Sequence, residues 1–220
     1  MARRREIEVR HYYELRTVDG RELTEEQLAD MRRFSRRIEL TPTSLIGDFT
    51  QETDPLFDAE TLLKQYFDVF LYFDGSGPRH LMFRLPGAAA RIDAMRRFVI
   101  KDSFQGVEVK NGYGDDVIVR LSLWEEDGEL TYSDEVPEAW LDDLVPLHAS
   151  LLAGDYSPLW LGWELASRSG TRDRYQYPGS ASPDPADLDG LGEPEKMPPP
   201  LAALDEFLWP PAIHPRPGSD

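Results

Sequence analysis

The chain contains no cysteine among its 220 residues. This absence excludes disulfide bonds, thiolate nucleophiles and cysteine-ligated zinc, and it is typical of a protein in a reducing compartment. Long apolar runs are also missing, because the longest, Val69 to Phe73, is far shorter than the roughly 20 residues of a membrane-spanning helix. Charged residues after Arg3–Arg5 interrupt any targeting segment. We therefore expect a soluble, cytoplasmic protein with no membrane association.

Recognisable catalytic and metal-binding motifs are missing as well. No serine lies in a Gly-x-Ser-x-Gly elbow, and no two histidines have metal-ligand spacing. The histidines are His11, His80, His148 and His214. Folding can still bring His11 and His80 onto one sheet face, although ordinary packing is the simpler interpretation of each.

The acidic run 125–129 resembles a calcium loop only superficially. With Gly128 at the sixth position, Leu123 occupies the first ligand position and Asp134 stands where the bidentate glutamate belongs. A solvated connection explains the run better. We expect neither a metal nor a cofactor.

Charge is abundant and uneven. The net charge is −17, yet residues 1–37 have ten arginines against eight acidic residues, which leaves 14 basic and 33 acidic residues elsewhere. The candidate anion-contact residues are Arg32, Arg33, Arg36 and Arg37. The negative remainder disfavours nucleic acid as their partner, so helix stabilisation or contact with an acidic protein surface is the better interpretation.

Alternating and helical periodicities predict an α+β fold with a mixed or antiparallel sheet of five to seven strands. Strands are expected at 7–15, with Tyr12 and Glu14 on a solvated face, and at 69–73, 80–85, 107–109 and 117–123. An extended segment with an edge position at Pro42 is expected over 38–49. Short helices are expected near 62–66 and 88–95.

The best-specified helix begins at Thr24, which forms a capping box with Gln27, while Leu23 and Leu28 occupy the hydrophobic-staple positions. The four arginines above are expected toward its end. A second helical region spans 140–152, is interrupted at Pro146 and ends at Gly154.

A further helix follows Asp155 and Ser157 and carries one aromatic face. Tyr156, Trp160 and Trp163 on that face are interpreted as core packing, with a ligand pocket as the alternative.

The C-terminal part differs in composition from the rest. Residues 1–170 form the expected globular body, residues 171–200 have linker composition, and residues 210–220 are expected to be disordered. Between them, 201–209 is a predicted tail helix. Its candidate interaction residues are Leu201, Leu204, Phe207, Leu208 and Trp209. This apolar stripe needs a groove, either on the chain's own body or on a partner.

Five segments of the body share a pattern with other proteins. They are Tyr12-Tyr13-Glu14, Ile38–Thr43, Tyr66–Tyr72, Met82–Pro86 and Leu161–Trp163. Over about residues 9–168 the chain resembles an uncharacterised family of bacterial hypothetical proteins. The resemblance implies a shared fold and nothing about chemistry, because that family has no established activity.

The leading functional hypothesis is a non-catalytic protein-protein interaction or adaptor protein that binds a protein partner or a second copy of itself. The alternative is an enzyme or a small-ligand sensor of unrecognised type, whose carboxylates and histidines meet only in the folded chain. The first hypothesis depends mainly on the tail helix.

Overall fold

The computed structural model describes residues 11–33, 38–49, 59–74, 78–100, 105–123, 140–168 and 197–208. These residues form an α+β fold on a seven-stranded antiparallel sheet, which confirms the predicted fold class. The strands are β1 (His11–Arg16), β2 (Ile38–Leu40), β3 (Ser44–Phe49), β4 (Val69–Asp74), β5 (Arg79–Leu85), β6 (Gly106–Asn111) and β7 (Val117–Leu123). Their order across the sheet is β2-β3-β1-β4-β5-β7-β6.

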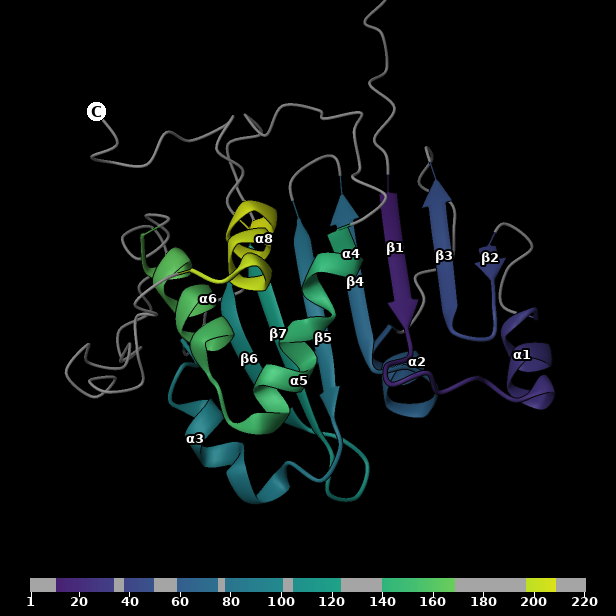
Figure 1. Cartoon of the computed structure of the whole chain (residues 1–220), viewed down its shortest axis with the longest axis horizontal. Coiled ribbons are helices and arrows are strands. Elements are labelled where there is room, and N and C mark those ends of the chain that lie inside the picture. Colours follow the sequence, from purple (N-terminus) through teal and green to yellow (C-terminus); the bar gives the residue numbers. More distant parts are fainter. Residues whose placement is uncertain are drawn as a thin grey trace, which may run out of the picture.

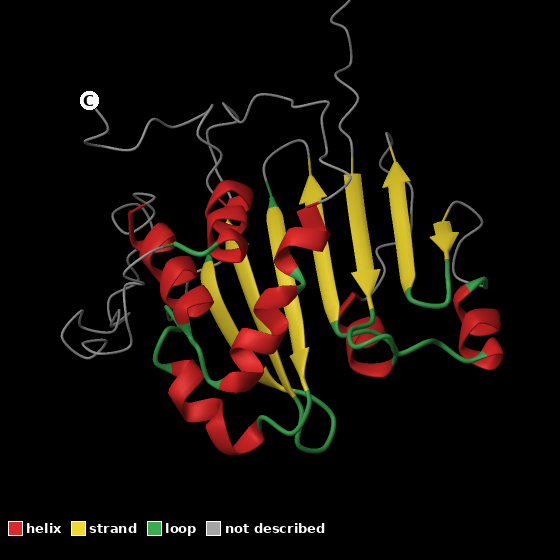
Figure 2. Cartoon of the chain, viewed as in Figure 1, coloured by secondary structure: helices red, strands yellow, loops and turns green. Residues whose placement is uncertain are grey.

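The helices lie unevenly on the two faces of the sheet. They are α1 (Glu25–Met31), α2 (Ala59–Gln65), the 3-10 turn η1 (Ala89–Arg91), α3 (Ile92–Arg96), α4 (Trp140–Leu144), α5 (Pro146–Ala153), α6 (Ser157–Arg168) and α8 (Pro199–Leu208). In Figure 1, α3 to α6 and α8 lie in front of β4 to β7. Figure 2 shows that β1, β3 and β2 have no helix in front of them in this view, and that α1 lies at the β2 end of the sheet.

The face covered by α3 to α6 and α8, here the first face, contains the larger apolar core. Its strand residues alternate along β4 and β5, as in Val69, Leu71 and Phe73, and Phe83 is fully buried. Gly162 of α6 lies so close to the sheet that a Cβ atom there would be 2.9 Å from a methyl carbon of Leu121. A small residue at this position therefore lets α6 approach the sheet.

The opposite, second face contains a smaller core that includes side chains from α1 and α2. Leu28 and Met31 of α1, Leu63 of α2 and Phe70 of β4 belong to it. On this face the ring of Tyr13 covers Gly47 on the neighbouring strand β3, at a place where any Cβ atom would overlap the ring. Gly47 is therefore the residue that lets an aromatic ring lie flat across β3.

Several local predictions are confirmed. The Thr24 hydroxyl accepts from the Gln27 amide while the Gln27 side chain accepts from the Thr24 amide, so the capping box forms as expected. The 140–152 region is divided at Pro146, which begins α5, and Gly154 ends that helix with a left-handed φ of 89°. The buried run 69–73 and its hairpin with β5 are present as well.

Strand β1 differs from its prediction, because it is buried on both faces. Tyr12 and Glu14, which were expected in solvent, have relative exposures of only 7% and 2%. Glu14 is buried because Tyr12 and Arg16 on the same strand face satisfy its carboxylate. The alternation of polar and apolar residues therefore predicted the strand correctly, but it did not predict that the polar side of the strand is buried. Residues 7–10 lie outside the described residues.

Three element boundaries also differ. Helix α1 ends at Met31, so Arg32 is its C-cap residue and Arg33 lies beyond the helix. Residues 38–49 form a hairpin of β2 and β3, because the 41–43 turn is closed by the Thr41 hydroxyl, which accepts from the amides of Thr43 and Ser44. Helix α8 begins at Pro199 instead of residue 201, since proline is tolerated in a first helical turn.

Candidate functional site

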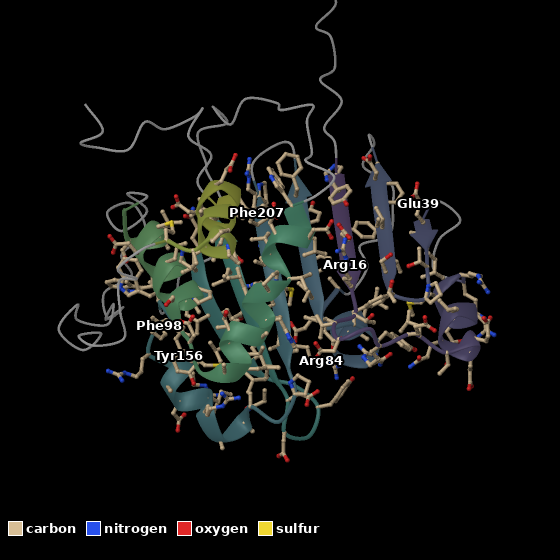
Figure 3. The ribbon with its side chains drawn as sticks, in the orientation of Figure 1. Arg16, Glu39, Arg84, Phe98, Tyr156 and Phe207 are labelled. Carbon is tan, nitrogen blue, oxygen red and sulfur yellow. The ribbon has the colours of Figure 1, made fainter. Side chains whose placement is uncertain are left out.

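Helix α8 packs on the chain's own body, against α4, α5 and α6 (Figures 1 and 3). Its apolar stripe, Leu201, Leu204, Phe207 and Leu208, is at most 3% exposed. The sequence left open whether a partner or the body receives this stripe, and in the structure the body does. These four side chains are therefore not exposed to a partner. Trp209 lies outside the described residues.

A single arginine ties the end of α8 to the sheet. Arg79 of β5 is 5% exposed, and its Nη1 donates to the carbonyl oxygen of Phe207 at 2.7 Å. Its guanidinium carbon lies 5.0 Å from the ring centroid of Phe73, 5.4 Å from that of Trp140 and 5.9 Å from that of Phe207. We call this arrangement the Arg79 clamp. It joins β4, β5, α4 and α8 through a charge-assisted hydrogen bond and cation-π contacts.

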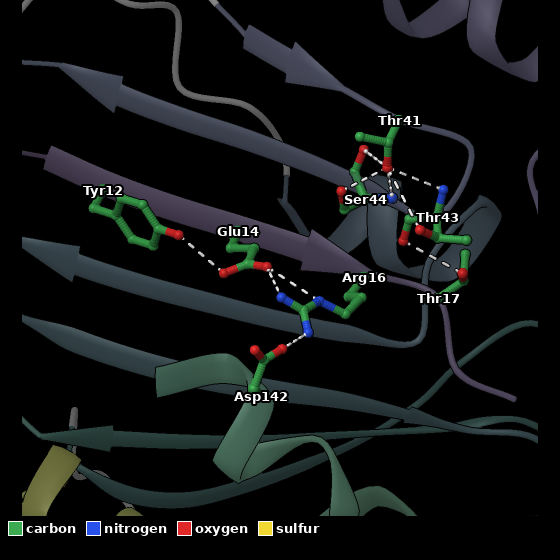
Figure 4. A network of polar contacts seen from close by, with 8 residues as sticks. All are labelled: Tyr12, Glu14, Arg16, Thr17, Thr41, Thr43, Ser44 and Asp142. Carbon is green, nitrogen blue, oxygen red and sulfur yellow. Dashed lines mark hydrogen bonds and ion pairs between the residues drawn. The ribbon is translucent and has the colours of Figure 1, made fainter. Parts of the chain in front are cut away.

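A buried polar network connects β1 with α4 on the first face (Figure 4). The Tyr12 hydroxyl donates to Glu14 at 2.9 Å, and Arg16 donates to Glu14 and to Asp142 of α4. Burial, followed by the neighbouring Glu14 carboxylate, raises the pKa of Tyr12, so this phenol stays protonated. Burial alone would lower the pKa of Arg16, but its bonds to Asp142 and Glu14 raise it overall. The network is buried at Glu14, reaches the surface at Asp142 and links α4 to β1.

A second ionic node lies between α2 and β4. Asp68 is 2% exposed and accepts from the Val18 amide at 3.0 Å, from Arg21 at 2.7 Å and from Arg84. Burial raises the pKa of Asp68, but hydrogen bonds from Arg21, Val18 and Arg84 lower it by more. Arg84 also contacts Asp116 at 3.2 Å. The carboxylate is therefore ionised and fully engaged in holding chain segments together.

His148 of α5 is the buried histidine of the first face. It is 3% exposed, and its Nε2 lies 2.8 Å from the carbonyl oxygen of Arg84, which requires the tautomer with a proton on Nε2. Burial lowers its pKa despite that hydrogen bond, so the ring is neutral near pH 7. His148 thus has a structural role as a donor.

The second face has a row of polar rings across four adjacent strands. His11 Nδ1 lies 3.2 Å from the Tyr72 hydroxyl, the Tyr72 and His80 rings stack at 5.7 Å with 14° between their planes, and His80 Nδ1 lies 2.9 Å from the Ser122 hydroxyl. We call these residues the second-face row. His11 and His80 therefore share one sheet face, connected through Tyr72. All but Ser122 are partly exposed.

Charged side chains join α2, β6 and β7. Glu60 of α2 pairs with Lys64 and Lys110, and Glu108 of β6 pairs with Lys110 and with Arg120 of β7. Hydrogen bonding to Lys64 is the main cause that lowers the pKa of Glu60, and bonding to Glu108 is the main cause that raises the pKa of Lys110. These pairs connect α2 to the β6 edge, and no charge of either sign dominates.

The remaining candidates have simple placements. Arg32 and Arg33 are exposed, and Arg33 pairs with Asp30 at 3.0 Å, whereas Arg36 and Arg37 lie outside the described residues. Whether the four arginines lie together therefore stays a prediction. The 125–129 run and His214 also lie outside the described residues.

The aromatic face of α6 packs into the first-face core, as expected. Trp163 is buried, while Tyr156 and Trp160 are partly buried against the same core. Tyr156 lies 6.3 Å from Phe98, between ring centroids (Figure 3).

Sequence reasoning missed the Arg79 clamp, the network around Glu14 and the ion pairs of Asp68. The hairpin register offered one signal, since a turn after Asp74 pairs Phe73 with Arg79. The partners on α4 and α8 gave none, because they lie 61 and 128 residues away from Arg79. Within the described ranges, no group of three His, Cys, Asp or Glu side chains is arranged to bind a metal ion. None of the helices there is long and apolar enough to cross a membrane.

Comparison with protein-family models, with curated proteins and with solved structures finds no match to this chain. The resemblance to a bacterial family therefore stays a prediction. Function has to be inferred from the geometry of the described residues.

Proposed function

We propose that the protein is a non-catalytic interaction protein and that the second-face row is the centre of its contact surface for a protein partner. The observation that carries this proposal is the alignment of His11, Tyr72, His80 and Ser122 across four adjacent strands, with the three rings partly exposed. The tail helix, which first suggested an adaptor, is engaged internally and plays no part in it.

The chemistry of the row favours binding over catalysis. Ser122 and His80 resemble a nucleophile and its base, but Ser122 is 5% exposed and lies within β7, which pairs with strands on both sides. Backbone amides in such a ladder are already used as donors, so they cannot stabilise an oxyanion beside this hydroxyl. The Ser122 and His80 pair is thus suited to fixing the ring of His80, which in turn stacks on Tyr72.

A protein partner suits the row because of its composition and shape. Aromatic rings with polar tips, held rigid by their neighbours, contribute strongly to protein interfaces, since little side-chain entropy is lost when they are covered. Four adjacent strands span roughly 14 Å, which is wide enough for the centre of an interface. The ion pair of Arg120 with Glu108 supplies a polar rim, because Arg120 lies two residues from Ser122 on the same face of β7.

The test compares affinity-tagged full-length chains expressed in their native host. We expect a stoichiometric partner to copurify with the wild type and with Tyr113→Ala, a matched control at the exposed aromatic residue of the β6-β7 turn. We expect the same partner to be lost with His80→Ala, and the difference to recur when the purified proteins are mixed. A partner that is retained by His80→Ala, or no partner of the wild type at all, would contradict the proposal.

A further inference from the structure

We propose that α8 is a reversible latch, which opens as a unit while the seven-stranded sheet stays folded, and that the Arg79 clamp sets how often it opens. This inference is independent of the proposed partner surface, because α8 lies on the first face and the second-face row lies on the other.

Helix α8 depends on tertiary contacts for its order. It has ten residues, and an isolated helix of this length is marginal in water. Prolines at positions 198 to 200 start it, and the sequence of the preceding 171–196 region has linker composition. The docked state is therefore maintained by the buried stripe and the clamp.

The sheet does not need α8 for its hydrogen bonds. Strands β4, β5 and β7 pair with one another along their length, and the backbone amides at the start of α8 donate to the carbonyl oxygen of Pro198. The apolar stripe of α8 packs on the body through side chains, and Arg79 donates to the carbonyl oxygen of Phe207. Undocking thus breaks the bond from Arg79 to Phe207, and no pairing among β4, β5 and β7 involves α8.

The clamp lies where it controls this step. Arg79 caps the C-terminal end of α8, where carbonyl groups lack intrahelical donors, and the ring of Phe207 packs edge-on against Trp140 at 5.2 Å. Phe73 packs against Trp140 at 5.7 Å. Removing the guanidinium would leave the Phe207 carbonyl without this donor and the three rings without the cation between them.

The consequence is an apolar surface that the protein can expose reversibly. Opening uncovers the sides of α4 and α6 that α8 now covers, including Trp140, without global unfolding. Such sub-global openings have free energies below that of the whole domain.

The test is native-state hydrogen exchange on the full-length chain in increasing urea. We expect the amides of residues 203–208 to exchange through an opening that costs less than the opening of β4, β5 and β7. Arg79→Met should speed exchange in α8 by at least about tenfold and leave the strands nearly unchanged, since a charge-assisted bond and its cation-π contacts are lost.

The matched control is Arg91→Met. Arg91 likewise donates to a helix C-terminal carbonyl, that of Leu152 on α5, at 2.5 Å, so its loss should not speed exchange in α8. If the α8 amides of the wild type exchange only with the central strands, α8 belongs to the cooperative core and the proposal is wrong. That comparison needs no variant, so it decides the matter even if Arg79→Met fails to fold.

Discussion

The two faces of the sheet solve the same packing problem in different ways. The first face is covered mainly by helices from the C-terminal half of the chain, and its buried charged groups, Arg79 and Glu14, are enclosed by aromatic rings or by neighbours on the same strand. The second face has a smaller apolar core, and ion pairs join its helix α2 and its strand ends to the sheet.

This difference shows how one acidic chain divides its stabilising interactions. Apolar burial does not depend on ionisation, whereas the ion pairs of the second face do. Arg84 makes contacts on both faces. Its carbonyl oxygen accepts a hydrogen bond from His148 on the first face, and its guanidinium binds Asp68, the residue just before β4, on the second face. The stability of variants on the two faces should therefore respond differently to the same change of pH.

The largest loss of stability is expected for a substitution at Asp68. Asp68→Asn leaves Arg84 and Arg21 partly buried without their shared carboxylate, and breaking such a buried pair costs about 3–5 kcal/mol. Urea unfolding at pH 7 measures this loss. The matched control is Asp116→Asn, which removes the outer partner of the same Arg84 and should cost about 1 kcal/mol or less.

The sign of the pH dependence follows from the lowered pKa of Asp68. The contribution of Asp68 to the free energy of unfolding is complete above the ordinary carboxyl pKa of about 3.8–3.9. It is lost as the pH falls through the lowered pKa that Asp68 has in the folded chain. If Asp68→Asn and Asp116→Asn destabilise equally, the second face does not depend on this buried carboxylate.

The glycines of the two faces provide a comparison of intermediate size. Gly47→Ala forces a Cβ atom into the rigid Tyr13 ring, and such overpacking costs about 1–3 kcal/mol. At Gly162 the nearest atom is the flexible end of Leu121, and alanine also gains about 1 kcal/mol of helix propensity. We expect Gly162→Ala to leave the free energy of unfolding nearly unchanged. Thermal unfolding of both variants tests this. Equal losses of stability would show that both close contacts are rigid.

Local signals in the sequence predicted much of the fold. The Thr24 capping box, the break at Pro146 and the buried run 69–73 depend on neighbouring residues, so their periodicity and spacing were sufficient. The burial of Glu14 was not predictable from the sequence. The alternation of β1 predicts a solvated face, but α4 covers that face, and Asp142 of α4, which binds Arg16, lies 126 residues further along the chain.

The second-face row was predictable only in part. That His11 and His80 can share a face follows from the strand alternation, but their connection through Tyr72 requires β4 to lie between β1 and β5. Sequence periodicity gives the faces of a strand and not the order of strands. The Arg79 clamp was out of reach for the same reason, since it needs α4 and α8 to converge on β5.

The smallest effect on stability is expected from the titration of His148, on the first face. Because burial lowers its pKa, the folded chain keeps this ring neutral at a pH where the unfolded chain, with an ordinary value of about 6.5, begins to bind a proton. The unfolded state then holds more protons, so stability is lost as the pH falls below about 6.5 and the loss continues down to the lowered folded-state pKa.

The expected size of this loss follows from the same linkage. Between pH 7.5 and pH 5.5 the wild type should lose up to about 1.4 kcal/mol relative to His148→Gln, whose amide can still donate to the Arg84 carbonyl oxygen but does not titrate. Asp68 remains ionised throughout this range because its pKa is lowered, so the second-face ion pair does not contribute. Urea unfolding at several pH values measures both slopes. If the two proteins show the same slope, the acid response over this range originates elsewhere than at His148, and the first face is as insensitive to pH as its apolar packing alone would make it.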